Sequence, residues 1–373
     1  MHRKKTYILF LMIFFSMFLM GCWDKIEIED RAYAITIGVD LNQDEDNQLS
    51  ITFAFPNPSA VLGESDEPVM KITGAGDSIY EVMRSIGTRS NRQIYLGHFR
   101  TVLIGEEVAK RPELFRGVLD ALEKDPHVSR KVNIGIVEGT AKEVLDIKPS
   151  LGPDITQFIR QIFEHDKLIN RAPLQTLNEI FEFMHRSEDG LITRIIPGAT
   201  DVKVAGAAVF KDFEFLGYIG EEVNRGLMFL QDEADIGIFT VEHNDQKIPI
   251  EVTDTKTKYK LAQTDNDFKI IVEISMEGDI RQLYFDLKND VLETGFLHEL
   301  GSLLESRIKA NVNHSLGVLQ NEYGVDLVGF DEYIEKFHPK IWGEIKDEYD
   351  EIFPQMDVVI EVDAEIRRIG LSK

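Results

Sequence analysis

The chain contains one cysteine, Cys22, and it stands directly behind an apolar N-terminal run. Residues 1–5 form a short basic region with Arg3, Lys4 and Lys5, and the fifteen residues from Thr6 to Met20 carry no charge. As a helix this run would be about 22 Å long, short of the roughly 30 Å hydrocarbon core of a bilayer. A basic start, a short apolar core and then a small residue, Gly21, is typical of a secretory signal peptide. The sequence therefore predicts an exported chain whose leader occupies residues 1–21.

The residues around the cysteine refine this prediction. Leu19 three places before Cys22 and Gly21 one place before it resemble the signal of bacterial lipoproteins. That resemblance implies a diacylglyceryl group on the Cys22 thiol and cleavage that leaves Cys22 as the first residue. An uncleaved signal anchor, or a cysteine buried by chance, remains the alternative. One cysteine also excludes an internal disulfide and a cysteine-rich metal site.

The charge of the chain restricts its partners. The formal net charge is −24, and removal of residues 1–21, which hold three basic and no acidic side chains, takes it to −27. Such a protein is expected to be repelled by nucleic acid and by anionic lipid surfaces. Membrane attachment would therefore depend on the acyl chains, and two chains hold stably where one binds only marginally.

The 352 residues after the leader suggest two or three domains. Alternating strands and helices predict an N-terminal α/β domain over residues 22–195, with a turn-rich boundary near Ser187–Thr200. We expect a small, β-rich middle domain over residues 196–255. The strands expected in the first two domains are Ala32–Leu41, Leu49–Phe55, Thr101–Gly105, Val132–Val137, Val202–Phe210, Phe213–Ile219, Ile236–Val241 and Ile248–Thr253. The helices expected are Asp77–Arg92 with Asp77 as N-cap, Glu106–Lys124 interrupted by Pro112, and two near Asp154–His165 and Pro173–His185.

The pattern of residues 256–373 predicts an α+β domain. Strands are expected at Lys256–Leu261 and Phe268–Met276, and apolar residues at three- and four-residue steps predict a long helix over Asn289–Tyr323. A second helical region covers Glu332–Phe353, and strict alternation from Val358 onward predicts a final strand with one buried face. The overall fold class is α+β (mixed α/β), with a mostly antiparallel C-terminal sheet and long helices on one of its faces.

No residues in the sequence form a catalytic, metal or cofactor motif. The histidines are scattered without metal-ligand spacing, and His298-Glu299 lacks the second histidine of a zinc-protease motif. Gly74-Ala75-Gly76-Asp77 resembles a phosphate loop but is better explained as a turn and helix cap. Trp23 suits a membrane interface or a contact with the first domain, and Trp342 suits helix packing or, as the alternative, a partner surface.

Four stretches, in this order, resemble the Ger(x)C family, the C subunits of nutrient germinant receptors of spore-forming bacteria. They are Gly21–Asp24 with Ile37–Asp40, then Tyr95–His98, then Gly206–Lys211 with Leu216-Gly217 and Glu222, and lastly Pro339–Trp342 with Phe353-Pro354 and Arg367–Leu371.

The resemblance implies three α/β domains, no enzymatic activity, no cofactor, and a lipoprotein on the outer face of the spore inner membrane. It also implies partnership with integral membrane A and B subunits in a complex that responds to small nutrients. On this basis we expect a lipid-anchored scaffolding or signalling subunit. A solute-binding lipoprotein that captures a nutrient is the alternative, and it would need a pocket of a few hundred Å³. A cell-wall hydrolase would need a carboxylate pair in a cleft, which the sequence does not show.

Overall fold

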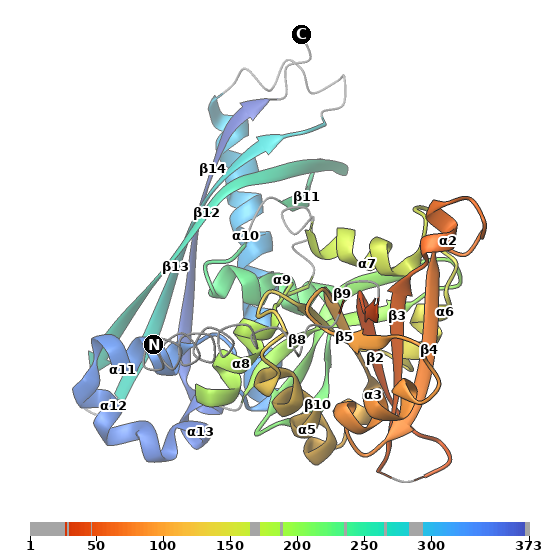
Figure 1. The fold of residues 1–373 in the computed structure, drawn as a ribbon. Coiled ribbons are helices and arrows are strands. Elements are labelled where there is room, and N and C mark those ends of the chain that lie inside the picture. The colour runs from red at the N-terminus through yellow and green to blue at the C-terminus, as the bar shows by residue number, and fades with distance from the viewer. Residues whose placement is uncertain are drawn as a thin grey trace, which may run out of the picture.

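The computed structural model describes residues 27, 30–45, 47–164, 172–186, 189–234, 237–264, 267–282 and 294–369. Their strands form an eight-stranded, a four-stranded and a two-stranded sheet. In Figure 1 the eight-stranded sheet occupies the centre and right, and the four-stranded sheet with one long helix rises on the left. The expected mixed α/β fold class is confirmed.

The eight-stranded sheet has the order β10-β9-β8-β7-β6-β2-β3-β4. Its central strands β8, β7, β6 and β2 are parallel, and the strands on either side of them are antiparallel. Parallel strands are covered on both faces, which is why they are continuous apolar runs in the sequence. The strands are β2 Thr36–Leu41, β3 Leu49–Pro56, β4 Val69–Gly76, β6 Thr101–Gly105, β7 Asn133–Val137, β8 Gly190–Pro197, β9 Val202–Lys211 and β10 Glu214–Ile219.

Helices cover this sheet through two separate apolar clusters. Side chains of α3, α5 and α8 belong to the cluster that contains Ile37 and Val39, and those of α6 and α7 belong to the cluster that contains Leu103 and Val137. The helices are α2 Pro58–Val61, α3 Ile79–Gly87, α4 Glu106–Ala109, α5 Pro112–Lys124, α6 Ala141–Asp146, α7 Ile155–Glu164 and α8 Leu177–Arg186.

Two local predictions in this region need correction. The N-cap of α3 is Ser78, whose Oγ accepts the N–H of Glu81, and not Asp77. The strand expected over Ala32–Leu41 is two strands: β1 Arg31–Tyr33 leaves the large sheet and pairs in parallel with β5 Gln93–Tyr95. The chain breaks between them because the N–H of Ala34 bonds to the Tyr95 carbonyl while Ile35 bonds to β3.

The segment Ser187–Thr200, expected to be a turn-rich boundary, contains strand β8. Strands β9 and β10 then continue the same sheet, so the eight-stranded sheet crosses the expected boundary between residues 195 and 196. The next elements, α9 Glu221–Leu230 and β11 Gly237–His243, contribute side chains to the C-terminal core instead. How these parts divide into independently folding domains stays a prediction.

The C-terminal sheet has the order β11-β12-β13-β14 and is antiparallel except for the β13–β14 pair. Its long strands are β12 Gln246–Thr264, β13 Asp267–Ile280 and β14 Asp357–Ile369. The two strands expected at Ile248–Thr253 and Lys256–Leu261 are one 19-residue strand with a register shift between Val252 and Asp254. The bulge explains why the apolar alternation changes phase in the sequence.

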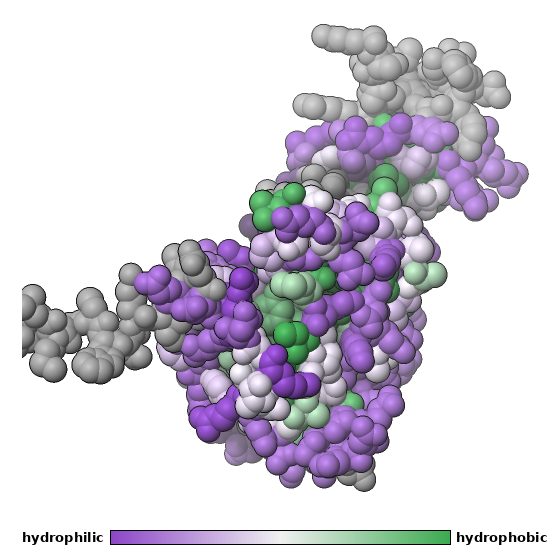
Figure 2. Space-filling view, turned by 45° about the vertical axis from the view of Figure 1, so that its right-hand side comes forward, coloured by the Kyte–Doolittle hydropathy of each residue, from purple (hydrophilic) through white to green (hydrophobic). Residues whose placement is uncertain are grey.

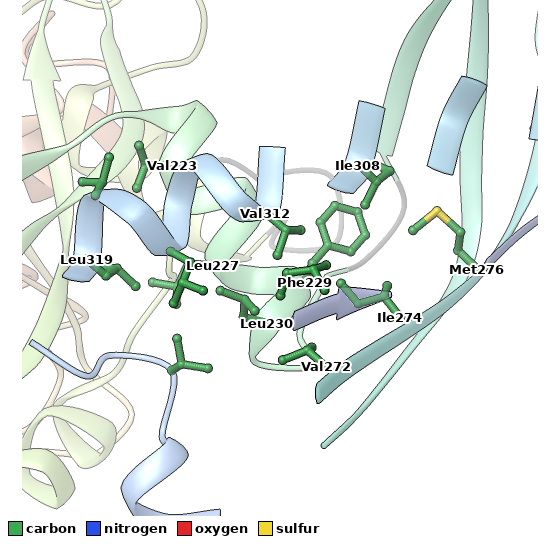
Figure 3. Close-up of a cluster of buried hydrophobic side chains, with 14 of the residues drawn as sticks. Val223, Leu227, Phe229, Leu230, Val272, Ile274, Met276, Ile308, Val312 and Leu319 are labelled. Atoms are coloured by element: carbon green, nitrogen blue, oxygen red, sulfur yellow. The ribbon is translucent and has the colours of Figure 1, made fainter. Parts of the chain in front are cut away.

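The predicted long helix is present as α10 Thr294–Val318, continued by the π-helix η5 Leu319–Tyr323. Residues 289–293 of the expected helix lie outside the described residues. Helix α9 packs beside α10, and Figure 3 shows side chains of α9, α10 and β13 meeting in one cluster. Helix α9, which precedes β11 in the sequence, therefore contributes side chains to the C-terminal core.

Side chains bond to backbone groups at both borders of the C-terminal sheet. At β14, the N–H of Ala364 donates to Glu305 of α10 at 3.1 Å, and a Cβ on Gly301 would lie 2.7 Å from the Ala364 carbonyl oxygen. At β12, beyond the reach of β11, the N–H of Thr257 donates to Asp232 at 2.6 Å. The Tyr333 hydroxyl donates to the Tyr259 carbonyl there at 3.0 Å. These bonds occupy polar groups that would otherwise be unpaired.

The helical region expected over Glu332–Phe353 is a chain of short helices. It comprises α11 Phe330–Phe337, α12 Pro339–Ile345, η6 Lys346–Glu348, α13 Tyr349–Ile352 and η7 Phe353–Gln355. Pro339 at the start of α12 forces the break because proline cannot continue a helix.

The face shown in Figure 2 is mostly hydrophilic, with small scattered hydrophobic patches. Within the described part of the chain, no helix is both long and apolar enough to span a bilayer.

Candidate functional site

A cleft of about 780 Å³ lies between α8 with the start of β8 on one side and residues 324–353 on the other. Gln231, Glu233 and Tyr259 complete its lining. Figure 1 shows the position, with α8 facing the short helices α11 to α13. Small-molecule sites in proteins typically have volumes in this range.

Asp326 organises the wall that follows α10. Its carboxylate accepts the backbone N–H groups of Val328, Gly329 and Asp331, each at 3.0 Å, and the Tyr349 hydroxyl at 2.6 Å. Gly329 has φ +87°, which turns the chain sharply into α11. Burial raises the pKa of Asp326, and the four hydrogen bonds oppose that rise. One carboxylate thus ties the first turn of α11 to α13.

The cleft is strongly acidic. Eight carboxylates line it, against three basic side chains. Because these carboxylates share a partly enclosed space, the cleft favours a ligand that carries positive charge. The acidic residues are Glu179, Glu182, Asp189, Glu233, Asp326, Asp331, Glu332 and Asp350, and the basic ones are Arg186, Lys336 and Lys346.

Besides Asp326, three of these carboxylates have a raised pKa. Burial raises the pKa of Asp331 to about 6, and the charge of Asp326 adds to the rise. Burial likewise raises the pKa of Asp189 to about 6, although the carboxylate accepts the N–H of Asp212 at 3.0 Å. Burial also raises the pKa of Glu233, with a further contribution from the charge of Glu179. A bound cation would favour the charged forms of all three.

Ion pairs connect the two sides of the cleft. Arg186 of α8 forms an ion pair with Glu332 of α11. Lys211 of β9 pairs with Asp350 of α13 at 3.0 Å. The Lys211 Nζ also donates to the Gly324 carbonyl at 3.5 Å. The first pair is half exposed on both sides and is therefore expected to add little stability.

Aromatic rings supply the apolar part of the lining. Tyr333 contacts Tyr259 and Phe337 with ring centroids 5.4 and 5.3 Å apart, and Trp342 meets Tyr349 edge-on at 5.3 Å. Trp342 is half-buried and packs against the C-terminal core, as helix packing predicted, but it also lines the cleft. Aromatic faces next to carboxylates are suited to organic cations.

The residues that the sequence singled out are not brought together. Cys22, Trp23 and His165 lie outside the described residues. No group of three or more His, Cys, Asp or Glu side chains could hold a metal ion in the described part of the chain. Gly74 and Gly76 lie in β4, where a Cβ on Gly74 would be 2.9 Å from Val82, so Gly74 permits close packing of α3.

Two structurally important carboxylates were missed. Asp326 could have been noticed because an Asp followed by Gly329 and a helix is a common turn signal. Asp40 is buried in β2 and accepts the N–H groups of Ala141 and Lys142 at 2.7 and 2.9 Å, which fixes the start of α6. Nothing in the local sequence links Asp40 to residues a hundred places later.

Comparison with known families gives two matches in order along the chain. "Spore germination protein N-terminal domain" matches residues 24–197, and "Spore germination B3/GerAC like, C-terminal" matches residues 205–370. Together these matches cover most of the chain.

Individual relatives agree. The chain is similar to spore germination protein YndF of Bacillus subtilis (strain 168), at 23% identity over 95% of this chain and 94% of the relative. It is also similar to spore germination protein B3 of the same organism, at 20% identity over 96% of this chain and 97% of the relative. A crystal structure of the GerBC protein matches with a TM-score of 0.61 and 18% identity, covering 89% of this chain and 98% of that chain. At that identity the structural match establishes the fold only.

Proposed function

Because this chain belongs to the spore germination B3/GerAC-like family, we propose that it is a lipid-anchored, non-enzymatic subunit of a nutrient germinant receptor. It would work with integral membrane A and B subunits on the outer face of the spore inner membrane. The names of its relatives assign them to spore germination, which supports a role for this chain in that process.

The position of the single cysteine is the observation that supports the proposed lipid anchor. Cys22 follows a short apolar leader, with Leu19 and Gly21 at the places that a lipoprotein signal needs. The chain after the leader has a formal net charge of −27, since residues 1–21 carry three of the basic side chains. Such a body gains little from general electrostatic attraction to a membrane, so two acyl chains are the attachment we expect.

The anchor gives the subunit its role. Confining the folded body to the membrane plane raises its effective concentration near membrane-embedded partners. The body then acts as a scaffold, presenting its surfaces at a fixed distance from the bilayer.

The test is Cys22→Ala in the spore-forming host, followed by membrane fractionation and a germination assay. We expect the variant to leave the membrane fraction and germination to be impaired, with Lys25→Ala as the neighbouring control that keeps both. Mass spectrometry of the native protein should find a diacylglyceryl adduct on an N-terminal Cys22. An unmodified thiol, or a variant that stays in the membrane and supports normal germination, would contradict the proposal.

A second candidate function is capture of a small nutrient, and the cleft of about 780 Å³ is the observation that favours it. Because carboxylates outnumber basic side chains in the cleft, it favours ligands with an ammonium or guanidinium group. Calorimetry of the whole protein against lysine, arginine and an acidic control, glutamate, tests this. Millimolar or tighter binding of the cations but not of glutamate would support capture, and heats equal to dilution would exclude it.

A further inference from the structure

A second cavity, of about 320 Å³, lies at one end of the eight-stranded sheet. It is found where β2, β4 and β6 begin and β3 ends, next to the first turns of α7. In Figure 1 α7 lies at the same end of the sheet as the passage from β3 into α2. None of the described residues lines both this cavity and the acidic cleft. Its volume is at the lower end of the range for small-molecule sites, so it suits a small metabolite.

Thr36, the first residue of β2, has an unpaired hydroxyl at this cavity. Ile37 and Val39 pack in the cluster of α3, α5 and α8, and side chains alternate along a strand, so Thr36 faces the other side, toward α6 and α7. Thr36 lines the cavity and is only 2% exposed, yet its hydroxyl has no hydrogen-bond partner in the described part of the chain. Buried polar groups are normally paired, so a polar group from outside the chain is expected beside it.

The basic side chains that line the cavity are His98, Arg100 and Arg160. Arg100 is exposed, and it forms no ion pair with any other described residue. Arg160 pairs with Glu164 at 3.4 Å, but both side chains of that pair are exposed, and pairs of this kind are weak. The guanidinium groups can therefore donate to an anion without breaking a strong contact.

Asp154 is the one carboxylate among the described residues that line the cavity. Its Oδ1 accepts the Thr156 hydroxyl at 2.5 Å and the N–H of Gln157 at 2.9 Å, which ties it to the start of α7. The acidic residues Glu27 and Asp30, which precede β1, do not line the cavity. Two arginines against one carboxylate give the lining an excess of positive charge, in a chain of net charge −24.

We propose that this cavity binds a small organic carboxylate. The oxygens of that carboxylate would accept hydrogen bonds from the Arg100 guanidinium and from the Thr36 hydroxyl, and an arginine presents donors in the geometry that a carboxylate needs. Part of the lining is apolar and suits a short hydrocarbon body better than it suits inorganic phosphate: Ile35, Pro56, Pro68 and Val69. This site goes beyond the proposed function, and it depends neither on the lipid anchor nor on cation capture in the cleft.

Matched small molecules test the class of ligand by calorimetry of the whole protein at neutral pH. Isovalerate and isoamyl alcohol share one branched hydrocarbon body, but only isovalerate carries a carboxylate. We expect isovalerate to bind with a Kd of about 10 mM or tighter. The alcohol should bind at least about tenfold more weakly, because hydrogen bonds to a charged group are stronger than neutral ones. Inorganic phosphate should give only the heat of dilution.

Two threonine variants separate binding from stability. Thr36 pairs in register with Thr101 of β6, whose hydroxyl is also buried and unpaired but does not line the cavity. Valine removes an unsatisfied polar group at either position, so Thr36→Val and Thr101→Val should both raise the midpoint of thermal unfolding of the free protein. Only Thr36→Val should weaken the binding of isovalerate, by at least about threefold, because only it removes a donor to the ligand.

An arginine pair tests the charge. Arg100→Gln should weaken the binding of isovalerate at least about tenfold, because it removes the charged donor. The matched control is Arg84→Gln on α3, which is exposed and belongs to a helix on the opposite face of the sheet, and it should bind as the wild type does. The comparison of isovalerate with isoamyl alcohol on the wild type stands by itself if Arg100→Gln fails to fold.

Equal binding of isovalerate and isoamyl alcohol would make the cavity an apolar pocket and overturn the carboxylate assignment. Preference for phosphate over isovalerate would overturn the choice of an organic anion. No binding of isovalerate to the wild type, or binding that Arg100→Gln and Thr36→Val leave unchanged, would overturn the site itself. The Cys22→Ala test reports on the anchor separately, because the cavity lies in the folded body and its calorimetry needs no membrane.

Discussion

The hydroxyl of Tyr349 donates a 2.6 Å hydrogen bond to the carboxylate of Asp326, which also accepts three backbone N–H groups at the start of α11. This hydrogen bond joins α11 to α13, two short helices. The wall of the cleft therefore depends on a single buried carboxylate and the groups that donate to it.

Removal of that hydroxyl should weaken the wall. Hydrogen bonds to charged groups contribute about 1.5–3 kcal/mol, so Tyr349→Phe is expected to lower the free energy of unfolding by about that amount. Urea denaturation followed by circular dichroism measures the change. Tyr80→Phe is the matched control, since Tyr80 is exposed and its hydroxyl donates to the Ala121 carbonyl at 3.2 Å. Equal stability of Tyr349→Phe and wild type would show that Asp326 is satisfied without it.

The pKa of Asp331 predicts a pH dependence. The folded chain raises it from 3.8 to about 6, so the folded state binds this proton more tightly than the unfolded state does. The stabilising contribution is complete below the unfolded value and is lost as the pH rises through about 6. Asp331→Asn should therefore raise the urea midpoint at about pH 7.5 and leave it nearly unchanged at about pH 4. Asp347→Asn, on exposed η6, is the control, and a gain for Asp331→Asn that is the same at both pH values would contradict the burial explanation.

Two glycines of α10 should respond oppositely to alanine. A Cβ on Gly301 would lie 2.7 Å from the Ala364 carbonyl oxygen of β14, whereas one on Gly317 would meet nothing closer than 3.7 Å. Alanine favours a helix interior over glycine by about 1 kcal/mol. Gly317→Ala should gain up to about that amount, and Gly301→Ala should lose stability because β14 must shift. Thermal unfolding of both variants decides, and a stabilised Gly301→Ala would mean that α10 can move away from the strand.

Asp40 should be needed for the junction of β2 and α6. Its carboxylate accepts two N–H groups at 2.7 and 2.9 Å. Asp40→Ala leaves the buried N–H of Ala141 and the partly buried N–H of Lys142 without their acceptor, which is expected to cost about 1–3 kcal/mol of unfolding free energy. Asp44→Ala, in the exposed turn after β2, should cost almost nothing. Comparable losses for the two variants would refute the capping role.

Trp342 should report on the occupancy of the cleft. The chain has two tryptophans, so Trp23→Phe leaves Trp342 as the single emitter. Titration with lysine is expected to change its emission, because the indole lines the cleft and packs on Tyr349 at 5.3 Å. Glutamate should produce no change. An unchanged spectrum with lysine up to about 10 mM, weaker than most specific ligands, would argue against cation capture.

The sequence predicted those elements that bury one face against one neighbour. Helix α10 was found because one apolar stripe faces one sheet, and β14 because strict alternation marks a strand with one buried face. Strand β8 was missed because Gly190 and Pro197, its first and last residues, resemble loop punctuation when read locally. Its position inside the sheet depends on partners that are distant in sequence.

The cleft could not be predicted. Its lining comes from α8 and the start of β8, from Gln231, Glu233 and Tyr259, and from the chain that follows α10, and no local pattern indicates that these segments meet. The raised pKa values of Asp189 and Asp331 likewise follow from burial, which tertiary packing creates. The proposed anchor stays a prediction, and it rests on a leader, which is a local signal that needs no tertiary structure.

The side chains bonded to the border strands of the C-terminal sheet affect how one copy of the protein can pair with another. Uncovered strand edges act as templates on which a second chain can add, and stacked additions grow into fibres. Here Glu305 at Ala364, Asp232 at Thr257 and Tyr333 at Tyr259 occupy three of the backbone positions that such an addition would use. A second chain that added at these places would first have to displace the three side chains, which disfavours pairing there.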